Sequence, residues 1–186
     1  MKRRGWIFGT AAVAALGAGA GVAWWQRGAA PAATKPDGTA QAAKPEGAAQ
    51  AAWGDALETP DGGKLALANY AGKPLLVNFW ATWCPPCVRE MPLLDRFAQE
   101  HRAGGWAVVG IAVDQMKPVR EFLARQPVSY AIGVAGLDAL TWVRSLGNVG
   151  GGLPFTVLMD ASGAIVQRKI GELHAEELAG WVAALR

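Results

Sequence analysis

The only two cysteines of the chain, Cys84 and Cys87, lie three positions apart in the stretch NFWATWCPPCVREMP. Two thiols at this spacing can form a redox dithiol, part of a metal site or a small structural disulfide loop. A tetrahedral zinc site needs four ligands, and the chain adds only the distant His101 and His174. A c-type haem attachment needs histidine directly after the second cysteine, where Val88 stands.

The position of the pair favours redox chemistry. A disulfide over so short a loop constrains the unfolded chain little, so a purely structural role fits poorly. Cys84 follows an apolar run and precedes a helical pattern, and a helix N-terminus stabilises a thiolate. We therefore expect Cys84 to be the nucleophile and the more shielded Cys87 to resolve the mixed disulfide. Pro85 and Pro86 suit the first turn of a helix, where their missing N–H groups cost little.

The longer string VNFWATWCPPCVREMP, with Pro92 five residues after the second cysteine, resembles the thioredoxin superfamily and its membrane-anchored TlpA/ResA-like branch. The resemblance covers residues 53–186. It implies an α/β, thioredoxin-like fold, a central mixed sheet flanked by helices, with an extra αβ insertion around AGLDALTWVRSLGNVGGG. It also implies that Pro154, in GGLPFTVLMD, is the cis-proline that faces the cysteine pair, and that Trp83 is the tryptophan that shapes the surface around the nucleophile.

Two positions near the cysteines refine the resemblance. Cytoplasmic thioredoxins carry a buried aspartate six residues before the first cysteine, where this chain has Asn78, which cannot take up a proton. Glu90, three residues after Cys87, lies on the same side of the expected helix and matches a glutamate that TlpA/ResA-like proteins place near their active site. We expect Glu90 to handle the proton of the Cys87 thiol, with its pKa raised by partial burial. The alternative is a solvated helix glutamate that pairs with Arg89 or another neighbour.

The elements that must position these residues alternate between apolar runs, which predict buried strands, and apolar residues at helical spacing. Their order is β-α-β-α-(β-α)-β-β-α, after an extended lead-in with a turn at PDGG. The expected strands are 74–80, 106–114, 128–134, 155–160 and 164–170, the last two joined by the hairpin signal ASG. The expected helices are 85–101, 117–126, 137–147 and 174–186.

The basic charge of the chain is confined to its N-terminal tail. Residues 1–52 hold six basic and two acidic side chains, whereas residues 53–186 hold 12 basic and 13 acidic ones. A domain without basic excess gives a nucleic-acid partner no support.

The tail itself opens with MKRR and about 20 mostly apolar residues, enough to cross a bilayer as a helix. We interpret residues 1–27 as a cytoplasmic cap and transmembrane signal-anchor, and residues 28–52, rich in alanine and proline, as a flexible linker to the domain at 53–186. The alternative is a cleaved signal peptide, because Ala18-Gly19-Ala20 resembles a processing site. Both interpretations place the domain outside the cytoplasm, and the first attaches it to the bacterial cytoplasmic membrane.

The leading hypothesis is an extracytoplasmic thiol–disulfide oxidoreductase with neither a metal nor another cofactor. The resemblance implies that it reduces disulfides of client proteins, for example during cytochrome c maturation, with electrons from a membrane thiol protein. One alternative is a copper metallochaperone, although such carriers have CxxxC and a distal histidine. Another is a thiol oxidant or peroxidase, and a peroxidase would carry Thr or Ser where this chain has Ala81.

Overall fold

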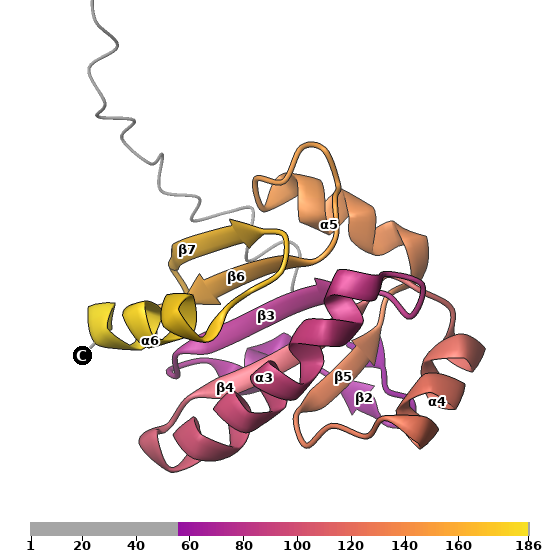
Figure 1. The fold of residues 1–186 in the computed structure, drawn as a ribbon, viewed down its shortest axis with the longest axis horizontal. Helices are drawn as coiled ribbons and strands as arrows, with labels where there is room; N and C mark the ends of the chain where they lie inside the picture. The colour runs from indigo at the N-terminus through magenta and orange to yellow at the C-terminus, as the bar shows by residue number, and fades with distance from the viewer. Residues whose placement is uncertain (1–55, 186) are drawn as a thin grey trace, which may run out of the picture. The chain divides into compact units, whose positions relative to one another are not determined.

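The computed structural model describes residues 56–185. The predicted anchor (1–27) and linker (28–52) lie outside the described residues, as do positions 53–55 and Arg186. In the described part of the chain, no helix is both long enough and apolar enough to cross a membrane. The fold is α/β, with a seven-stranded mixed sheet between helices (Figure 1).

The strands and helices follow the predicted order with small shifts at their ends. The strands are β1 (Leu57–Glu58), β2 (Lys64–Leu65), β3 (Leu75–Trp80), β4 (Ala107–Ala112), β5 (Ala131–Val134), β6 (Phe155–Met159) and β7 (Ile165–Ile170). The helices are α3 (Pro85–His101), α4 (Met116–Arg125), α5 (Ala139–Ser145) and α6 (Ala175–Ala184), with short 3-10 turns η1 (Leu67–Tyr70), η2 (Arg102–Gly104) and η3 (Gly136–Asp138).

One segment differs from the sequence-based expectation. The extended lead-in forms a hairpin, β1–β2, which adds two short strands to the sheet next to β5. Its turn is closed by a hydrogen bond from Thr59 N to the Gly63 carbonyl (3.1 Å), and Gly62 takes a positive φ of 91° there. Strands of two residues are too short to produce a period-two pattern, so the sequence indicated only the turn.

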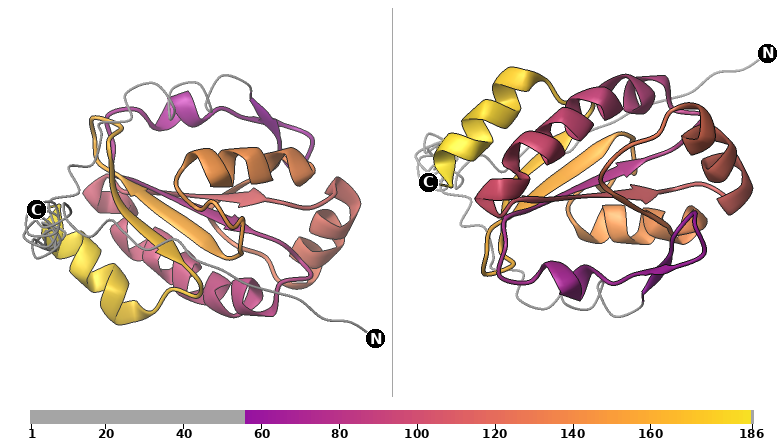
Figure 2. Two further views of the ribbon diagram at one scale, coloured as in Figure 1. Left: turned by 90° about the horizontal axis from the view of Figure 1, so that it is seen from above. Right: turned by 90° about the horizontal axis from the view of Figure 1, so that it is seen from below.

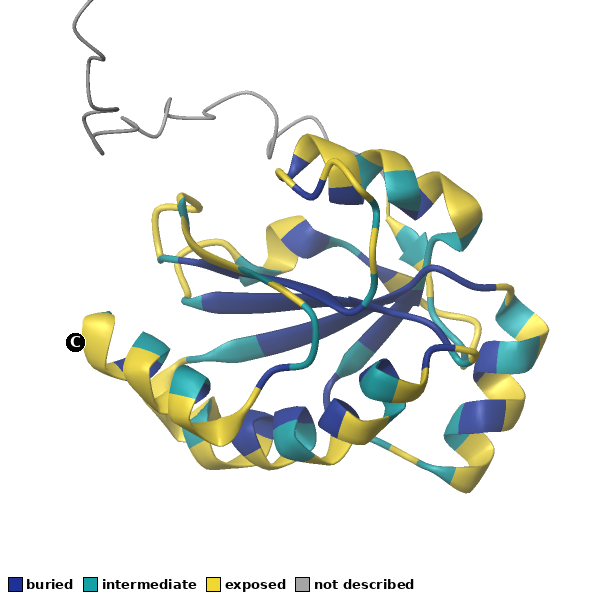
Figure 3. Ribbon diagram, turned by 45° about the horizontal axis from the view of Figure 1, so that its top comes forward, coloured by how far each residue is buried: buried dark blue, intermediate teal, exposed yellow. Residues whose placement is uncertain are grey.

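Strand β3 lies inside the sheet, whose order is β2-β1-β5-β4-β3-β6-β7. It runs parallel to β4 and antiparallel to β6, while β7 forms an edge. All six residues of β3 are buried, which explains the nearly continuous apolar run LLVNFW. Figure 3 shows the inner strands in the colour of buried residues, whereas most of β7 is exposed.

The period of two along β3 divides its side chains between two cores. Leu76 and Trp80 lie in the core under α3 and α6, and Val77 and Phe79 lie in the core on the side of α5 and η1. Figure 2 shows α3 and α6 on one face of the sheet and α5 on the other. Asn78 therefore points toward α3, and it is the only polar residue of the strand.

Helix α3 begins directly at the cysteine pair. Cys84 is its N-cap residue, with an extended backbone (φ −102°, ψ 100°), and the two prolines fill the first turn as predicted. Pro92 lies inside the helix and offers no N–H to the Val88 carbonyl four residues earlier. Gln126 Nε2, at the end of α4, donates a weak hydrogen bond of 3.5 Å to that carbonyl. The helix thus continues through its proline.

Candidate active site

The two cysteines form a disulfide just beyond the C-terminal end of β3, with their Cα atoms 5.3 Å apart. Cys84 retains 5% of its surface, whereas Cys87, one turn further along α3, is fully buried. The structure therefore gives the expected order of accessibility. An incoming sulfur meets Cys84 first, as thiol–disulfide exchange with Cys84 as nucleophile requires.

The prolines between the cysteines change the electrostatics of this helix end. A helix N-terminus normally presents several unpaired N–H groups to an anion. Pro85 and Pro86 have none, so Cys87 carries the first N–H of α3. The Val88 N–H is already used, because it donates to the Cys84 carbonyl at 3.1 Å. A Cys84 thiolate thus gains less stabilisation here than at a helix start without prolines.

The segment before Cys84 is held by Asp114, a residue that the sequence analysis did not single out. Asp114 follows β4, next to the end of β3, and is buried. Its Oδ2 accepts hydrogen bonds from Thr82 N (3.0 Å) and Thr82 Oγ1 (2.6 Å). Trp83 follows Thr82 and is 64% exposed, so its ring stands at the surface beside the nucleophile. An acid directly after a buried parallel strand was the available signal for Asp114.

Pro154 lies beside the same end of β3. The Leu153–Pro154 peptide bond is cis, as the resemblance implied. Phe155, the next residue, pairs with Phe79 near the end of β3. Pro154 therefore lies beside the end of β3, where the segment that leads to Cys84 begins. The Pro154 carbonyl accepts a hydrogen bond from Gly171 N at 2.8 Å, which ties this loop to the end of β7.

Glu90 lies on the buried face of α3, with 2% of its surface exposed. Its Oε1 accepts a hydrogen bond from Asn78 Nδ2 (2.7 Å), and its Oε2 accepts one from the Leu173 backbone N–H (2.7 Å). Asn78 Nδ2 also donates to Thr156 Oγ1 at 2.9 Å. Asn78 and Thr156 are fully buried, so a polar network shielded from solvent lies between the sheet and the helix that carries Cys87.

The burial of Glu90 makes it titrate near neutrality. Burial raises the pKa of Glu90 to about 7, and the negative charges of Glu172 and Glu177 act in the same direction. The hydrogen bonds from Leu173 and Asn78 favour the carboxylate and lower the pKa, but they do not outweigh burial. The predicted upward shift is confirmed, and Glu90 can both take up and release a proton near pH 7.

The alternative of a solvated Glu90 paired with Arg89 is wrong. Arg89 points away and forms an ion pair with Glu172, with Nη2 and Oε2 2.6 Å apart. Glu172 directly precedes Leu173, so this pair fastens to α3 the loop whose N–H holds Glu90. Sequence spacing could not identify this loop as a partner, because it lies 83 positions from Arg89.

Thr156, like Leu173, is a member of the network that the sequence analysis did not single out. It stands two positions after Pro154 and is the one polar residue of β6, and its pairing with Asn78 places it on the α3 face of the sheet. The pairing of β6 with β3 brings the two side chains together across 78 positions. A polar residue in an otherwise apolar strand was its signal.

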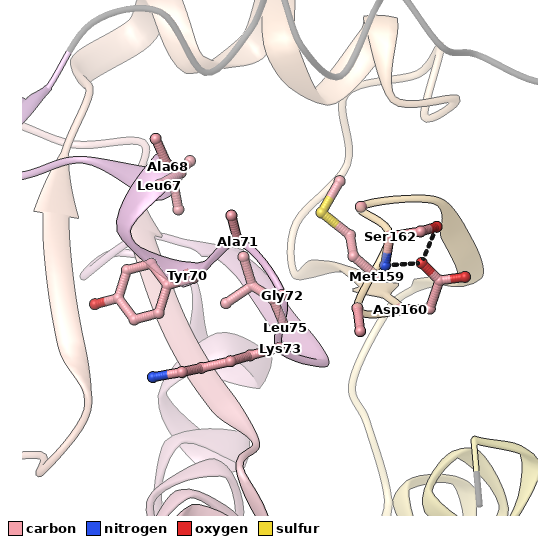
Figure 4. Close-up of a pocket in the computed structure, with 12 residues that line it drawn as sticks. Leu67, Ala68, Tyr70, Ala71, Gly72, Lys73, Leu75, Met159, Asp160 and Ser162 are labelled. Atoms are coloured by element: carbon pink, nitrogen blue, oxygen red, sulfur yellow. Dashed lines mark hydrogen bonds between the residues drawn. The ribbon is translucent and has the colours of Figure 1, made fainter.

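A separate cavity of about 290 Å³ lies at the opposite end of β3 (Figure 4). Its walls include Leu75 and Met159, which pair at the start of β3, and the β6–β7 turn. In that turn Asp160 Oδ1 accepts hydrogen bonds from Ser162 N and Oγ, so this carboxylate oxygen is used to hold the turn together. Within residues 56–185, no three His, Cys, Asp or Glu side chains gather as a metal site would require.

Comparisons with known proteins agree with this geometry. The Redoxin family matches residues 29–185. The chain is similar to the thiol-disulfide oxidoreductase ResA of Bacillus cereus (29% identity over 123 residues, 66% of this chain and 69% of that protein). It is also similar to the thioredoxin-like protein YneN of Bacillus subtilis (33% identity over 129 residues, 66% and 71%). Among solved structures, a secreted Mycobacterium tuberculosis disulfide oxidoreductase homologous to E. coli DsbE shares 25% identity with a TM-score of 0.57, covering 70% of this chain and 96% of that one.

Proposed function

Because the chain belongs to the Redoxin family and is a thiol–disulfide oxidoreductase, we propose that it reduces disulfides of client proteins outside the cytoplasm. The observation that supports this most directly is the disulfide at the start of α3, with a buried carboxyl of near-neutral pKa, that of Glu90, on the same helix. Cys84 and Cys87 carry the electrons and Glu90 carries the proton. Asn78, Trp83 and the prolines 85, 86 and 154 form the framework around them.

The reaction proceeds in two exchanges. The Cys84 thiolate attacks one sulfur of the client disulfide, which forms a mixed disulfide and releases the other client sulfur as a thiolate. The Cys87 thiol then gives its proton to the Glu90 carboxylate and attacks Cys84 Sγ. The Cys84–Cys87 disulfide forms, and the second client sulfur leaves and is protonated. The second client thiolate takes the proton that Glu90 received, and the first takes from solvent the proton that Cys84 released when it ionised, so the client gains two electrons and two protons and the dithiol loses them.

The start of helix α3 supports the reductive direction. A dithiol is strongly oxidising when its reduced, thiolate form is stabilised, chiefly by helix N–H groups and nearby positive charge. Pro85 and Pro86 remove two of these N–H groups beside Cys84. A less stabilised thiolate makes the couple a better electron donor.

The proposed location rests on the N-terminal sequence. The apolar stretch in residues 1–27 is long enough to anchor the chain, and the Mycobacterium tuberculosis relative is secreted. In an oxidising compartment the dithiol needs a supply of electrons, which a membrane thiol protein would deliver. Apoproteins whose cysteines must be reduced before cofactor attachment, as in cytochrome c maturation, are suitable clients.

The role of Glu90 predicts a specific pH dependence. In the wild-type protein the step that resolves the mixed disulfide should accelerate as pH rises through about 7, where Glu90 ionises and can accept the Cys87 proton. In Glu90→Gln this acceleration should disappear, with a loss of about 100-fold near pH 8, the lower range of general-base effects. Below about pH 6 the two proteins should converge, because the wild-type carboxyl is then protonated. Stopped-flow kinetics of the reduced protein with a disulfide peptide measure the step.

Glu100→Gln is the matched control for this experiment, because Glu100 is an exposed carboxyl on the same helix. Its profile should follow the wild type. Equal pH profiles for Glu90→Gln and the wild type would rule out Glu90 as the proton acceptor, while leaving the two cysteines in their proposed roles.

A further inference from the structure

We propose that the side-chain amide of Asn78 turns over by half a rotation when Glu90 takes up a proton. One end of the amide then holds the carboxylate, and the other end holds the carboxylic acid. The inference deepens the proposed function, since it rests on Glu90 changing its protonation during the reaction. It makes Asn78 a positioning residue for the proton.

The observed geometry corresponds to ionised Glu90. A carboxylate can only accept hydrogen bonds, and the Nδ2 end of Asn78 donates to Glu90 Oε1 at 2.7 Å. The same Nδ2 donates to Thr156 Oγ1 at 2.9 Å. The other end, Oδ1, is buried and accepts no hydrogen bond from any residue in the described part of the chain. Asn78 thus uses only one end of its amide in this state.

Protonation of Glu90 reverses the requirement at Oε1. The Leu173 backbone N–H can only donate, so Oε2 must remain an acceptor. We place the proton on Oε1, because Asn78 beside it can offer an acceptor by turning its amide, whereas the Leu173 N–H beside Oε2 cannot. The new O–H then points at an N–H, and two donors do not bond to each other. In the disulfide form Cys87 has no thiolate that could accept the proton instead.

Turning the amide gives the Glu90 O–H an acceptor without moving another side chain, and it moves Nδ2 to the buried position where Oδ1 has no partner in this state. The two ends of an asparagine amide have nearly the same size and shape, so the exchange costs little packing. Oδ1 then accepts from Glu90 O–H and, with its second lone pair, from the Thr156 hydroxyl. Thr156 can follow the change because a hydroxyl both donates and accepts. An aspartate at this position could not serve both states, since an ionised carboxylate has no donor.

Glu90 is the ionisable member of this network, and the titratable groups around it are Tyr130, Glu172, Glu177 and His174, the residue after Leu173. Strands β3 and β6 contribute Asn78 and Thr156, which do not ionise. Tyr130, ahead of β5, stays neutral because burial raises its pKa. Glu172 and Glu177 face Glu90 from the β7–α6 side; each is held in an ion pair, which lowers its pKa, so both remain charged.

Side-chain NMR of the disulfide-bonded, full-length protein in detergent tests the turnover. The chain has three asparagines, Asn69, Asn78 and Asn148, so asparagine labelled with ¹⁵N gives three side-chain signals. Asn148 is a built-in control: it is buried and donates to the Gly152 carbonyl at 2.7 Å, a partner that does not titrate. The Glu90 carboxyl carbon is followed in parallel with ¹³C-labelled glutamate.

The Asn78 amide protons should show cross-peaks to Thr156 near pH 9 and lose them near pH 5, about two units on either side of the Glu90 midpoint. The midpoint of this change should equal that of the Glu90 carboxyl, about 7, while the Asn148 signal stays constant. Glu90→Gln adds a test that does not depend on titration. The Leu173 N–H requires the amide oxygen of the glutamine, so its NH₂ group faces Asn78 and should lock the turned orientation at every pH.

The outcomes separate this inference from the proposed function. If Glu90 titrates while Asn78 keeps its Thr156 cross-peaks at both pH values and in Glu90→Gln, the turnover is wrong and the proton role of Glu90 stands. If Glu90 does not titrate between about pH 5 and 9, its role in proton transfer is wrong. The Glu90→Gln spectrum then still shows whether the Asn78 amide takes the turned orientation when a hydrogen-bond donor faces it.

Discussion

Replacing Cys87 by serine is expected to stop the reaction half-way and leave the client joined to Cys84 by a disulfide. Cys84, the more accessible sulfur, still attacks, but no second thiol remains to release the client. Turnover should fall by more than about 1,000-fold, as on loss of a catalytic nucleophile. Because a serine hydroxyl is close in size to a thiol, the fully buried position should keep its packing. Non-reducing electrophoresis with mass spectrometry detects the conjugate and identifies its client.

Cys84→Ser is the matched control. It should lose turnover equally but accumulate no conjugate, because the remaining Cys87 is fully buried. Conjugates formed through Cys87 in that variant, at the rate seen for Cys87→Ser, would contradict the assignment of nucleophile and resolving thiol.

Replacing Glu90 by glutamine should stabilise the disulfide form of the protein at alkaline pH. The folded-state pKa of Glu90, about 7, lies above the ordinary value of 4.5. The folded protein therefore binds more protons than the unfolded chain between these values, and the free energy of unfolding falls as pH rises through them. Above about pH 8 the buried carboxylate should cost roughly 3 kcal/mol, since each pKa unit corresponds to about 1.4 kcal/mol. Glutamine removes this cost.

Denaturant unfolding of both proteins at several pH values measures the effect. The variant should be more stable than the wild type by about 2–3 kcal/mol near pH 8 and nearly equal to it near about pH 3.5, where the wild-type carboxyl is protonated in both states. Glu100→Gln should show no such pH-dependent difference, because that side chain is exposed. A variant that is uniformly less stable at all pH values would contradict a buried, near-neutral Glu90.

The sequence predicted those parts of the site that depend on local rules. Cys84 at the start of α3 and the prolines in its first turn follow from capping chemistry, and the burial of Glu90 beside Cys87 follows from helical spacing. The cis bond before Pro154 came from the resemblance and not from any local pattern. Strand and helix order was predictable from β3 onward because the strands are apolar runs and the helices carry apolar residues at helical spacing.

The partners of Glu90 were not predictable in this way. Thr156 reaches the network only through the pairing of β6 with β3, and Leu173 reaches it through a backbone N–H that leaves no trace in the sequence. Asp114 fixes Thr82 because β3 and β4 are parallel and end side by side. These contacts link positions 32 to 83 residues apart, and sheet topology, not local propensity, creates them.

The reduction potential of the Cys84–Cys87 couple in the full-length protein tests the central claim most directly. Equilibration with glutathione or a dithiol of known potential, followed by thiol labelling, gives the value. A couple that reduces client disulfides should lie near about −270 mV, the range of thioredoxin. A value near about −120 mV, typical of dithiols that oxidise their clients, would contradict the reductive function and assign the protein to disulfide formation.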